Sequence, residues 1–352
     1  MRRLLVFALV LGAFLIACGS GDDDDAVATP SGPTATPAPA TPVTAIPARS
    51  GGPAPQGVPA GMGSTASEGV FPRTVAHFGG TTNIPAEPKR VIVIATGQID
   101  GVLTLGVVPI GAASALGASF TPDYITTAFP QQATALKSMV DIGSRAEPDF
   151  EKIAGLRPDL ILANKAGSEK LYDKFAAIAP TVFTEGTGVN WKQDFLLVAA
   201  ALGKTGKAQT FLNDYHTQAA ALATKVASKP VAVSMVRFNP GRTRMFGVSS
   251  FGGSIAYDAG LGRPAPQQFN ATSQDLSLEQ VNLMDGDWIF YSIQTPEEQT
   301  DAAKIVGQQF WNGLAAVKAG HVLKVDDDPW YLNAGPTAAM LVLKQLTAAL
   351  GG

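Results

Sequence analysis

The sequence predicts an α/β protein in which two lobes are joined by one long helix. Three observations lead to this fold class. Short apolar runs alternate with amphipathic stretches along residues 71–352, which is the pattern of mostly parallel strands connected by helices. The central stretch at 191–228 has helical character almost throughout, and a short motif recurs on both sides of it.

The first residues have the features of a secretory signal peptide covering residues 1–17. Two arginines precede the apolar run at 4–17, which is shorter than the roughly 20 residues that a helix needs to cross a bilayer. The run ends in LIAC, which resembles a bacterial lipobox, and Cys18 is the only cysteine of the chain. The resemblance implies that Cys18 carries lipid and anchors the mature protein on the outer face of the cytoplasmic membrane. An ordinary signal peptide cut near Ala17 is the alternative.

Residues 18–70 are predicted to form an extended tether between the lipid and a folded body. Four consecutive aspartates, Asp22–Asp25, are followed by a stretch rich in Pro, Ala, Thr and Gly. Such a composition cannot bury enough apolar surface to offset the entropy lost when the chain is ordered. A tethered domain stays near its own membrane, which suggests a partner there.

The composition of the remaining body excludes several classes of protein. The formal net charge of the chain is −3, and no basic stripe suggests binding to nucleic acid. Without another cysteine the body has neither disulfides nor thiolate metal sites. Because His77, His216 and His321 are scattered along the chain, we expect no bare zinc or manganese site. No second apolar segment approaches membrane-spanning length, so contact with the membrane is expected through the lipid alone.

The N-terminal lobe is assigned to residues 71–203 and the C-terminal lobe to residues 229–352. A connecting helix at 204–228, after a break near Gly203, would be roughly 30 Å long. Strands are expected at 90–95, 107–113, 159–164, 181–184, 230–238, 243–248, 287–293 and 321–325. Helices are expected between them, at 98–106, 149–157, 169–179, 277–284 and 335–352.

One motif occurs once in each lobe. The stretch FEKIAGLRPDLIL begins at Phe150, and LEQVNLMDGDWIF begins at Leu278. In each copy an acid, Glu151 or Glu279, opens a short helix. An aspartate eight residues later, Asp159 or Asp287, starts a strand. The repeat predicts two pseudo-equivalent lobes, although ordinary helix–strand alternation also produces such matches.

Candidate ligand-binding residues follow the expected strands, because ligands of parallel α/β sheets bind beyond the carboxyl ends of the strands. Arg242 and Arg244 lie near Arg237, around a turn signalled by NPG. Arg237 and Arg244 form the stronger pair, because Arg242 is close to the turn itself. Guanidinium groups offer forked donors to oxygen-rich anions, and aromatic residues would supply a wall, although Trp330 also fits a core position. The same rule selects Thr96, Gln98, Lys165, Trp330 and Tyr331.

No motif for catalysis or for a cofactor is found. GKTGK at 203–207 lacks the glycine that a phosphate-binding loop needs five residues earlier, where Val198 stands. GVSSFGG lacks the spacing of a nucleophile elbow, since Phe251 stands two residues after Ser249. ATGQIDG is not a dinucleotide-binding fingerprint. We therefore expect a binding protein without catalytic residues.

Several segments resemble one known family. PKRVIVIATGQIDGVLTLGVVPIGAA, DIGSRAEPDFEKIAGLRPDLILAN and DDDPWYLNAGPTAAMLVL resemble the iron-siderophore and vitamin B12 type of substrate-binding protein of ABC importers. The resemblance covers residues 71–352 and implies the class III periplasmic-binding-protein fold, in which two Rossmann-like lobes on a rigid helix hold a ligand between them. It also implies that a glutamate on each lobe docks into arginine pockets of the permease.

By motif position the docking glutamates are Glu151 and Glu279, with Glu147 as an alternative in the first lobe. An acid that merely favours a helix N-terminus is the competing explanation. The resemblance further implies a ferric siderophore as ligand, permease and ATPase subunits as partners, and no resident cofactor or metal. Haem or cobalamin as the ligand stays open, and so does a sensor or surface lipoprotein without a transport role.

Overall fold

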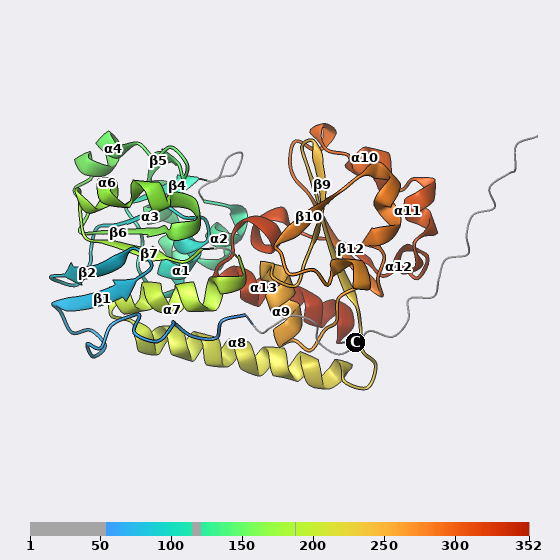
Figure 1. The fold of residues 1–352 in the computed structure, drawn as a ribbon, viewed down its shortest axis with the longest axis horizontal. Helices are drawn as coiled ribbons and strands as arrows, with labels where there is room; N and C mark the ends of the chain where they lie inside the picture. Colours follow the sequence, from blue (N-terminus) through green and yellow to red (C-terminus); the bar gives the residue numbers. More distant parts are fainter. Residues whose placement is uncertain (1–53, 115–120, 187, 352) are drawn as a thin grey trace, which may run out of the picture. The chain divides into compact units, whose positions relative to one another are not determined.

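The structure is a computed structural model that describes residues 54–114, 121–186 and 188–351. Cys18, the signal peptide and residues 18–53 of the expected tether lie outside the described residues, so the lipid anchor stays a prediction. Figure 1 shows the fold of the chain.

The N-terminal lobe contains a five-stranded parallel sheet in the order β5-β4-β3-β6-β7. The central strands β3 and β6 are buried along their whole length, as expected when helices cover both faces of a parallel sheet. Chain connections leave β3 and β6 toward opposite edges of the sheet, so the loops after these strands diverge and leave a crevice. The strands are β3 (Val91–Val93), β4 (Gly111–Ser114), β5 (Val140–Ser144), β6 (Leu160–Asn164) and β7 (Thr181–Thr184).

The helices of this lobe are short and connect consecutive strands. An antiparallel hairpin, β1 (Arg73–His77) and β2 (Gly80–Ile84), precedes the sheet and is absent from the sequence-based prediction. The α-helices are α1 (Gln98–Thr104), α2 (Asp123–Ala128), α3 (Ala133–Lys137), α4 (Phe150–Gly155), α5 (Lys165–Ser168) and α6 (Tyr172–Ala176). Three 3₁₀ turns are η1 (Pro130–Gln132), η2 (Glu169–Leu171) and η3 (Gly188–Asn190).

The C-terminal lobe has a mixed sheet in the order β10-β9-β8-β11-β12. Strands β8, β11 and β12 are parallel, whereas β9 and β10 run antiparallel at one edge. Here the chain leaves β8 and β11 toward opposite edges, which creates a second crevice at their carboxyl ends. The strands are β8 (Val233–Asn239), β9 (Arg242–Phe246), β10 (Ser273–Leu276), β11 (Trp288–Ile293) and β12 (Val322–Lys324).

The helices of this lobe depart in part from the sequence-based prediction. Segment 277–284 was expected to be α-helical, but it is the 3₁₀ element η5 (Leu278–Met284), with a kink at Gln280 beside a Ser277 capping box. The α-helices are α9 (Phe251–Asp258), α10 (Ala302–Ile305), α11 (Gln309–Gly313), α12 (Ala315–Lys318) and α13 (Pro336–Leu350). The prediction did not include α9 to α12. The remaining turns are η4 (Ala265–Gln267), η6 (Glu297–Gln299) and the π-helical η7 (Asp328–Leu332).

The internal repeat corresponds to equivalent positions in the two lobes. The carboxylate of Asp159, just before β6, accepts the backbone N–H groups of Lys89 and Arg90 at 2.8 Å, where the chain enters β3. Asp287, just before β11, accepts the N–H of Ala232 at 2.7 Å, where the chain enters β8. Each aspartate thus ties the start of its own strand to the start of the neighbouring central strand.

One long helix connects the lobes, and it follows α7 (Trp191–Leu202) of the N-terminal lobe. Helix α7 ends at Gly203, whose φ of 68° is the left-handed conformation that favours glycine at a helix end. Helix α8 (Thr205–Val226) then runs for 22 residues, about 33 Å at 1.5 Å per residue. Its first turn is closed by Glu68, whose Oε2 accepts the N–H of Gly206 at 3.1 Å. The predicted break and the long helix therefore stand where the sequence placed them.

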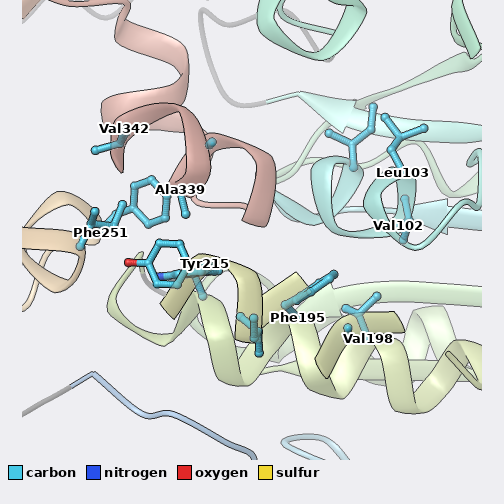
Figure 2. Close-up of a cluster of buried hydrophobic side chains, with 14 of the residues drawn as sticks. Val102, Leu103, Phe195, Val198, Tyr215, Phe251, Ala339 and Val342 are labelled. Atoms are coloured by element: carbon cyan, nitrogen blue, oxygen red, sulfur yellow. The ribbon is translucent and has the colours of Figure 1, made fainter. Parts of the chain in front are cut away.

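The lobes share one large apolar core, and each lobe also has a smaller apolar cluster of its own. Figure 2 shows Val102 and Leu103 of α1, Phe195 and Val198 of α7, Tyr215 of α8, Phe251 of α9 and Ala339 of α13 within one buried cluster. The same cluster extends to Leu160 in one sheet and Phe290 in the other. A continuous, densely packed core resists large relative motion of the lobes.

Polar contacts reinforce this shared core. Asp100 of α1 is fully buried and accepts the N–H groups of Thr337 and Ala338 at 2.9 Å, so it closes the N-terminus of α13. Burial raises the pKa of Asp100. Lys192 of α7 is also fully buried and pairs with Asp258 of α9 at 2.6 Å.

Residues 54–70 differ from the expectation of an extended tether, because they pack against the body. Ala54 is buried, and Gly63 exchanges two backbone hydrogen bonds of 2.8 Å with Ala76 of β1. The guanidinium of Arg73 donates to the carbonyl oxygens of Ser67 and Ala200 at 2.6 Å. Backbone pairing of this kind leaves no trace in composition, and the predicted boundary at residue 70 is therefore too late.

Candidate functional site

One pocket lies where the carboxyl ends of the N-terminal strands meet the C-terminal lobe. The loop after β3, the ends of β6 and β7, and the segment 330–336 all contribute residues to its wall. The close approach of the lobes here depends on Gly97, which has a φ of 83° and whose added Cβ would lie 2.8 Å from the carbonyl oxygen of Ala334. A larger residue at position 97 would push the two walls of the pocket apart.

Thr96 and Gln98 both line the pocket, as the strand-end rule predicted. Gln98 is buried and its amide is used internally: Nε2 donates to the carbonyl of Ala163 at 2.9 Å, and Oε1 accepts the N–H of Ala95 at 3.2 Å. Gln98 therefore holds the β3 loop in place, whereas Thr96 presents a hydroxyl to the pocket. That hydroxyl accepts a hydrogen bond of 3.3 Å from Arg145.

Arg145 is an exposed pocket residue that sequence reasoning missed. It follows β5, a strand with the sequence VDIGS, in which Asp141 and Gly143 interrupt the apolar run by which strands were recognised. No carboxylate of the described residues lies within ion-pairing distance of Arg145. If β5 had been recognised as a strand, the rule that ligands bind beyond the carboxyl ends of strands would have selected Arg145.

Aromatic side chains form the inner part of the pocket. Trp191 and Phe251 meet edge to face with ring centroids 6.1 Å apart, and Phe246 lies 4.6 Å from Tyr331. Trp330 lines the pocket but is 1% exposed and stacks on Phe290 at 5.1 Å, and its indole N–H donates to Gln345. Trp330 is thus a core residue with one edge at the pocket. The pocket's aromatic residues are Trp191, Phe195, Phe246, Phe251, Trp330 and Tyr331.

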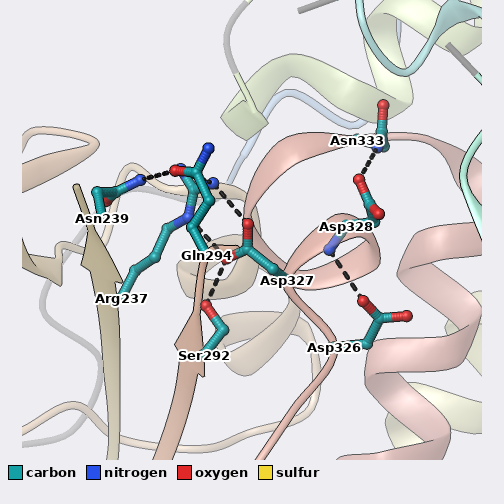
Figure 3. A network of polar contacts seen from close by, with 8 residues as sticks. All are labelled: Arg237, Asn239, Ser292, Gln294, Asp326, Asp327, Asp328 and Asn333. Atoms are coloured by element: carbon teal, nitrogen blue, oxygen red, sulfur yellow. Dashed lines mark hydrogen bonds and ion pairs between the residues drawn. The ribbon is translucent and has the colours of Figure 1, made fainter. Parts of the chain in front are cut away.

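Arg237 is not a pocket-lining residue. It is 4% exposed, and its Nε and Nη2 atoms bind both carboxylate oxygens of Asp327 at 2.7 and 2.6 Å, as Figure 3 shows. Ser292 donates to the same carboxylate at 2.5 Å, and Gln294 lies 3.3 Å from the guanidinium. This network joins the carboxyl ends of β8 and β11 to the loop after β12, so Arg237 has a structural role.

The other two arginines of the cluster differ sharply from each other. Arg242 is exposed and outside the pocket, where it pairs with Asp275 of β10 at 2.7 Å. Arg244 stands opposite Arg237 in the β8–β9 register and is half-buried, with its Cζ 5.0 Å from the ring centre of Phe246. Its Nε is buried without a hydrogen-bond partner, and no carboxylate of the described part of the chain pairs with it. Burial and the charge of Arg237 lower the pKa of Arg244.

Lys165 is also outside the pocket, contrary to expectation. It is the first residue of α5, and its ammonium lies 3.7 Å from Glu169, one turn further along the chain. The strand-end rule selects such a residue, but its ammonium lies beside Glu169 rather than in the pocket wall. Lys165 and Arg242 are therefore withdrawn as ligand-binding candidates.

One carboxyl group lies in the pocket wall. Asp194 of α7 accepts the N–H groups of Glu185 and Gly186 at 3.0 and 2.9 Å and so holds the loop after β7. Burial raises the pKa of Asp194 to about 7. Within the described ranges no group of three or more His, Cys, Asp or Glu residues is arranged to hold a metal ion.

The candidate docking glutamates stand at matching places in the two lobes. Glu151 is in the first turn of α4, after Asp149, whose Oδ1 accepts the N–H of Lys152 at 3.0 Å. Glu279 is in the first turn of η5, after the Ser277 capping box. Both carboxylates are exposed, as is Glu147, and none of the three is ion-paired within the described residues.

The fold and the pocket together are those of one class of protein. Two α/β lobes that share a core, with a long helix between them and a partly aromatic pocket at the strand ends, are typical of an extracytoplasmic solute-binding protein. A model of the periplasmic binding protein family matches residues 92–329. The chain belongs to this family, which confirms the predicted fold class and the prediction of a binding protein rather than an enzyme.

The named relatives are binding proteins, and one of them, the putative ABC transporter substrate-binding lipoprotein YhfQ of Bacillus subtilis, is 27% identical over 77% of this chain and 86% of the relative. The chain is 34% identical over 289 residues to the probable siderophore-binding lipoprotein YfiY of Bacillus subtilis, which covers 78% of this chain and 86% of that one. It is 31% identical to the petrobactin-binding protein YclQ of the same organism, over 74% of this chain and 81% of the relative. The solved structure of Staphylococcus aureus SirA with staphyloferrin B matches with a TM-score of 0.69 and 30% identity, over 79% and 98% of the two chains.

Membership in this family implies a permease and an ATPase as partners. A lipoprotein relative also agrees with an extracytoplasmic location. Over the part of the chain that the structure describes, no helix is both long and apolar enough to span a membrane.

Proposed function

We propose that this protein captures a ferric siderophore outside the cytoplasmic membrane and delivers it to an ABC importer. The carrying observation is that two guanidinium groups have no carboxylate partner among the described residues. Arg145 lines the pocket, and Arg244 lies over the ring of the pocket residue Phe246 without lining the pocket itself. A cation without a counter-charge beside a pocket favours an anionic ligand, because the ligand then supplies the charge that the protein lacks. Ferric chelates with carboxylate, catecholate or hydroxamate oxygens are ligands of this kind.

The size of the pocket supports a ligand that extends beyond it. Its volume is about 190 Å³, below the roughly 300–1,000 Å³ of typical small-molecule sites. A chelate would therefore extend from the aromatic floor at Trp191 and Phe251 into the open mouth. Arg145 reaches this mouth from the N-terminal lobe, and Arg244 lies over Phe246 on the C-terminal side. The relative YfiY is named as a probable siderophore-binding lipoprotein, which agrees with such a ligand.

Tryptophan fluorescence tests the binding part of this proposal, because Trp191 and Trp330 line the pocket. Ferric citrate, a ferric catecholate, a ferric hydroxamate, haem and cobalamin are titrated into the protein. At least one ferric chelate should quench saturably. Arg145→Ala and Arg244→Ala should each weaken its binding about tenfold or more, the scale of a hydrogen bond to a charged group.

Arg242→Ala is the matched control, since Arg242 lies two residues from Arg244 but pairs with Asp275 outside the pocket. Its affinity should stay within about twofold of wild type. Binding of haem or cobalamin with no response to any ferric chelate would overturn the proposed ligand. Equal losses in Arg242→Ala and Arg244→Ala would overturn the assignment of Arg244.

Delivery is proposed to use Glu151 and Glu279 as the carboxylates that meet cations of the permease, on a protein anchored through Cys18. Exposed, unpaired acids at equivalent positions of the two lobes support this role. The double variant Glu151→Ala/Glu279→Ala should bind the ferric chelate normally and import less iron in cells. Glu147→Ala, four residues earlier in the first lobe, tests the alternative acid, and it should import normally. Normal uptake by the double variant would refute the docking role.

A further inference from the structure

An apolar groove on the C-terminal lobe is unexplained by ligand binding. Only three large apolar side chains among the described residues are exposed: Val70, Leu278 and Phe310. Two of them line one groove of about 580 Å³ between η5 and the helices α10 and α11, together with Val281 and Ile305. Phe310 is 79% exposed and Leu278 is 48% exposed. Concentrated exposed apolar surface of this kind marks contact sites for other proteins.

The charges in the groove define what it can accept. Glu279 lies on its wall without an ion pair among the described residues. The cation of the groove, Lys304, is already paired with Asp301 at 2.8 Å. The groove therefore combines exposed apolar surface with one uncompensated negative charge. A complementary partner presents an apolar side chain next to a cation.

The surroundings of Glu151 in the other lobe differ. Its neighbour Phe150 is partly buried, with its ring 5.1 Å from Phe175 and with Lys174 above it at 5.4 Å. No large apolar side chain of the described α4 region is exposed. The two candidate docking acids are thus equivalent in backbone position but not in apolar surface.

We propose that this groove is a docking site for the permease subunit of the importer, and that Phe310 and Leu278 are its apolar contacts. A permease loop inserts an apolar side chain between them while its cation pairs with Glu279. The inference rests on the proposed function and adds to it that the C-terminal lobe contributes apolar contact as well as charge. Docking is then asymmetric, because only the C-terminal lobe supplies an apolar contact in addition to a charged one.

Two surface variants test the groove without endangering the fold. Phe310→Ala and Leu278→Ala/Phe310→Ala remove the exposed side chains, and Val70→Ala is the control because Val70 is 51% exposed but lies outside the groove. Each full-length lipoprotein is compared for binding and for cellular import of ⁵⁵Fe, supplied as the chelate that binds wild type most tightly in the fluorescence titration. The double variant should bind the chelate normally and import it about tenfold more slowly. Val70→Ala should import normally, and Phe310→Leu should retain most of the import rate.

A photo-crosslinking amino acid at position 310 identifies the occupant. The expected product joins this protein to the transmembrane subunit of the importer, identified by mass spectrometry. A crosslink to a second copy of this chain would overturn the proposal, as would normal import by the double variant. If Glu279→Ala lowers import but the groove variants do not, the groove fails and the docking role of Glu279 stands. If neither change lowers import, the docking part of the proposed function fails as well.

Discussion

Removal of Arg237 should destabilise the protein strongly. Arg237 is 4% exposed and contributes two hydrogen bonds of 2.6–2.7 Å to Asp327, whose side chain is 14% exposed. Arg237→Ala leaves a carboxylate in this protected position without its cation. Breaking such a pair from one side costs about 3–5 kcal/mol.

This loss can be converted to a melting temperature. With an unfolding entropy of about 2.1 cal/mol/K per residue over roughly 300 residues, each kcal/mol shifts the midpoint by about 1.6 °C. Arg237→Ala should therefore melt about 5–8 °C below wild type in a circular dichroism scan. The exposed pair of Arg242 with Asp275 is the matched control, and Arg242→Ala should shift the midpoint by no more than about 2 °C.

The double variant Arg237→Ala/Asp327→Ala separates the buried charge from the lost packing. It removes the carboxylate that Arg237→Ala leaves without its cation, so its melting temperature should be higher than that of the single variant. A single variant that melts with the wild type would refute the reasoning. So would a double variant no more stable than Arg237→Ala, because the penalty would then not come from Asp327.

Two further predictions concern buried polar groups. His77 is buried, and its Nδ1 accepts the N–H groups of Gly79 and Phe183 at 3.0 and 3.2 Å. Protonation of Nδ1 would turn this acceptor into a donor, so that it would face two other donors. Burial lowers the pKa of His77 to about 4, so its contribution is present above pH 6.5 and is lost as the pH falls toward 4, by up to about 3 kcal/mol. Urea unfolding of wild type and His77→Asn at pH 7 and pH 4 checks this, and an equal loss in both proteins would exclude His77 as the cause. Asp100→Ala should cost about 2–4 kcal/mol, because the N–H groups of Thr337 and Ala338 lose their acceptor. Hydrogen exchange of the first turn of α13 should accelerate in that variant, and unchanged protection there would contradict the capping role.

The parts of the fold that were predicted correctly are those that residues close together in the sequence determine. Buried central strands such as β6 appear as continuous apolar runs, and the break between α7 and α8 is marked by Gly203. The repeated Asp159 and Asp287 have equivalent backbone partners in both lobes. Elements with mixed polarity were missed: the β1–β2 hairpin, β5, and residues 54–70, whose order comes from backbone pairing with distant segments.

The site was predicted only in part because charge pairing is a long-range property. The sequence correctly placed three arginines near one turn and Thr96 near a strand end. It did not indicate that Asp327, ninety residues away, neutralises Arg237, or that Asp275 pairs with Arg242. Arg244 is distinguished by the absence of a partner among the described residues, which only coordinates can reveal. Arg145 was missed together with the strand that positions it.

The location of iron in the bound protein tests the central claim most directly. Crystals grown with the tightest ferric chelate and measured at the iron absorption edge locate the metal without reference to the protein model. The account predicts a single iron peak at the mouth of the pocket, with chelate oxygens in contact with Arg145 and Arg244 and the aromatic residues beneath. Iron held elsewhere, or a chelate that leaves both guanidinium groups in contact with solvent alone, would contradict it.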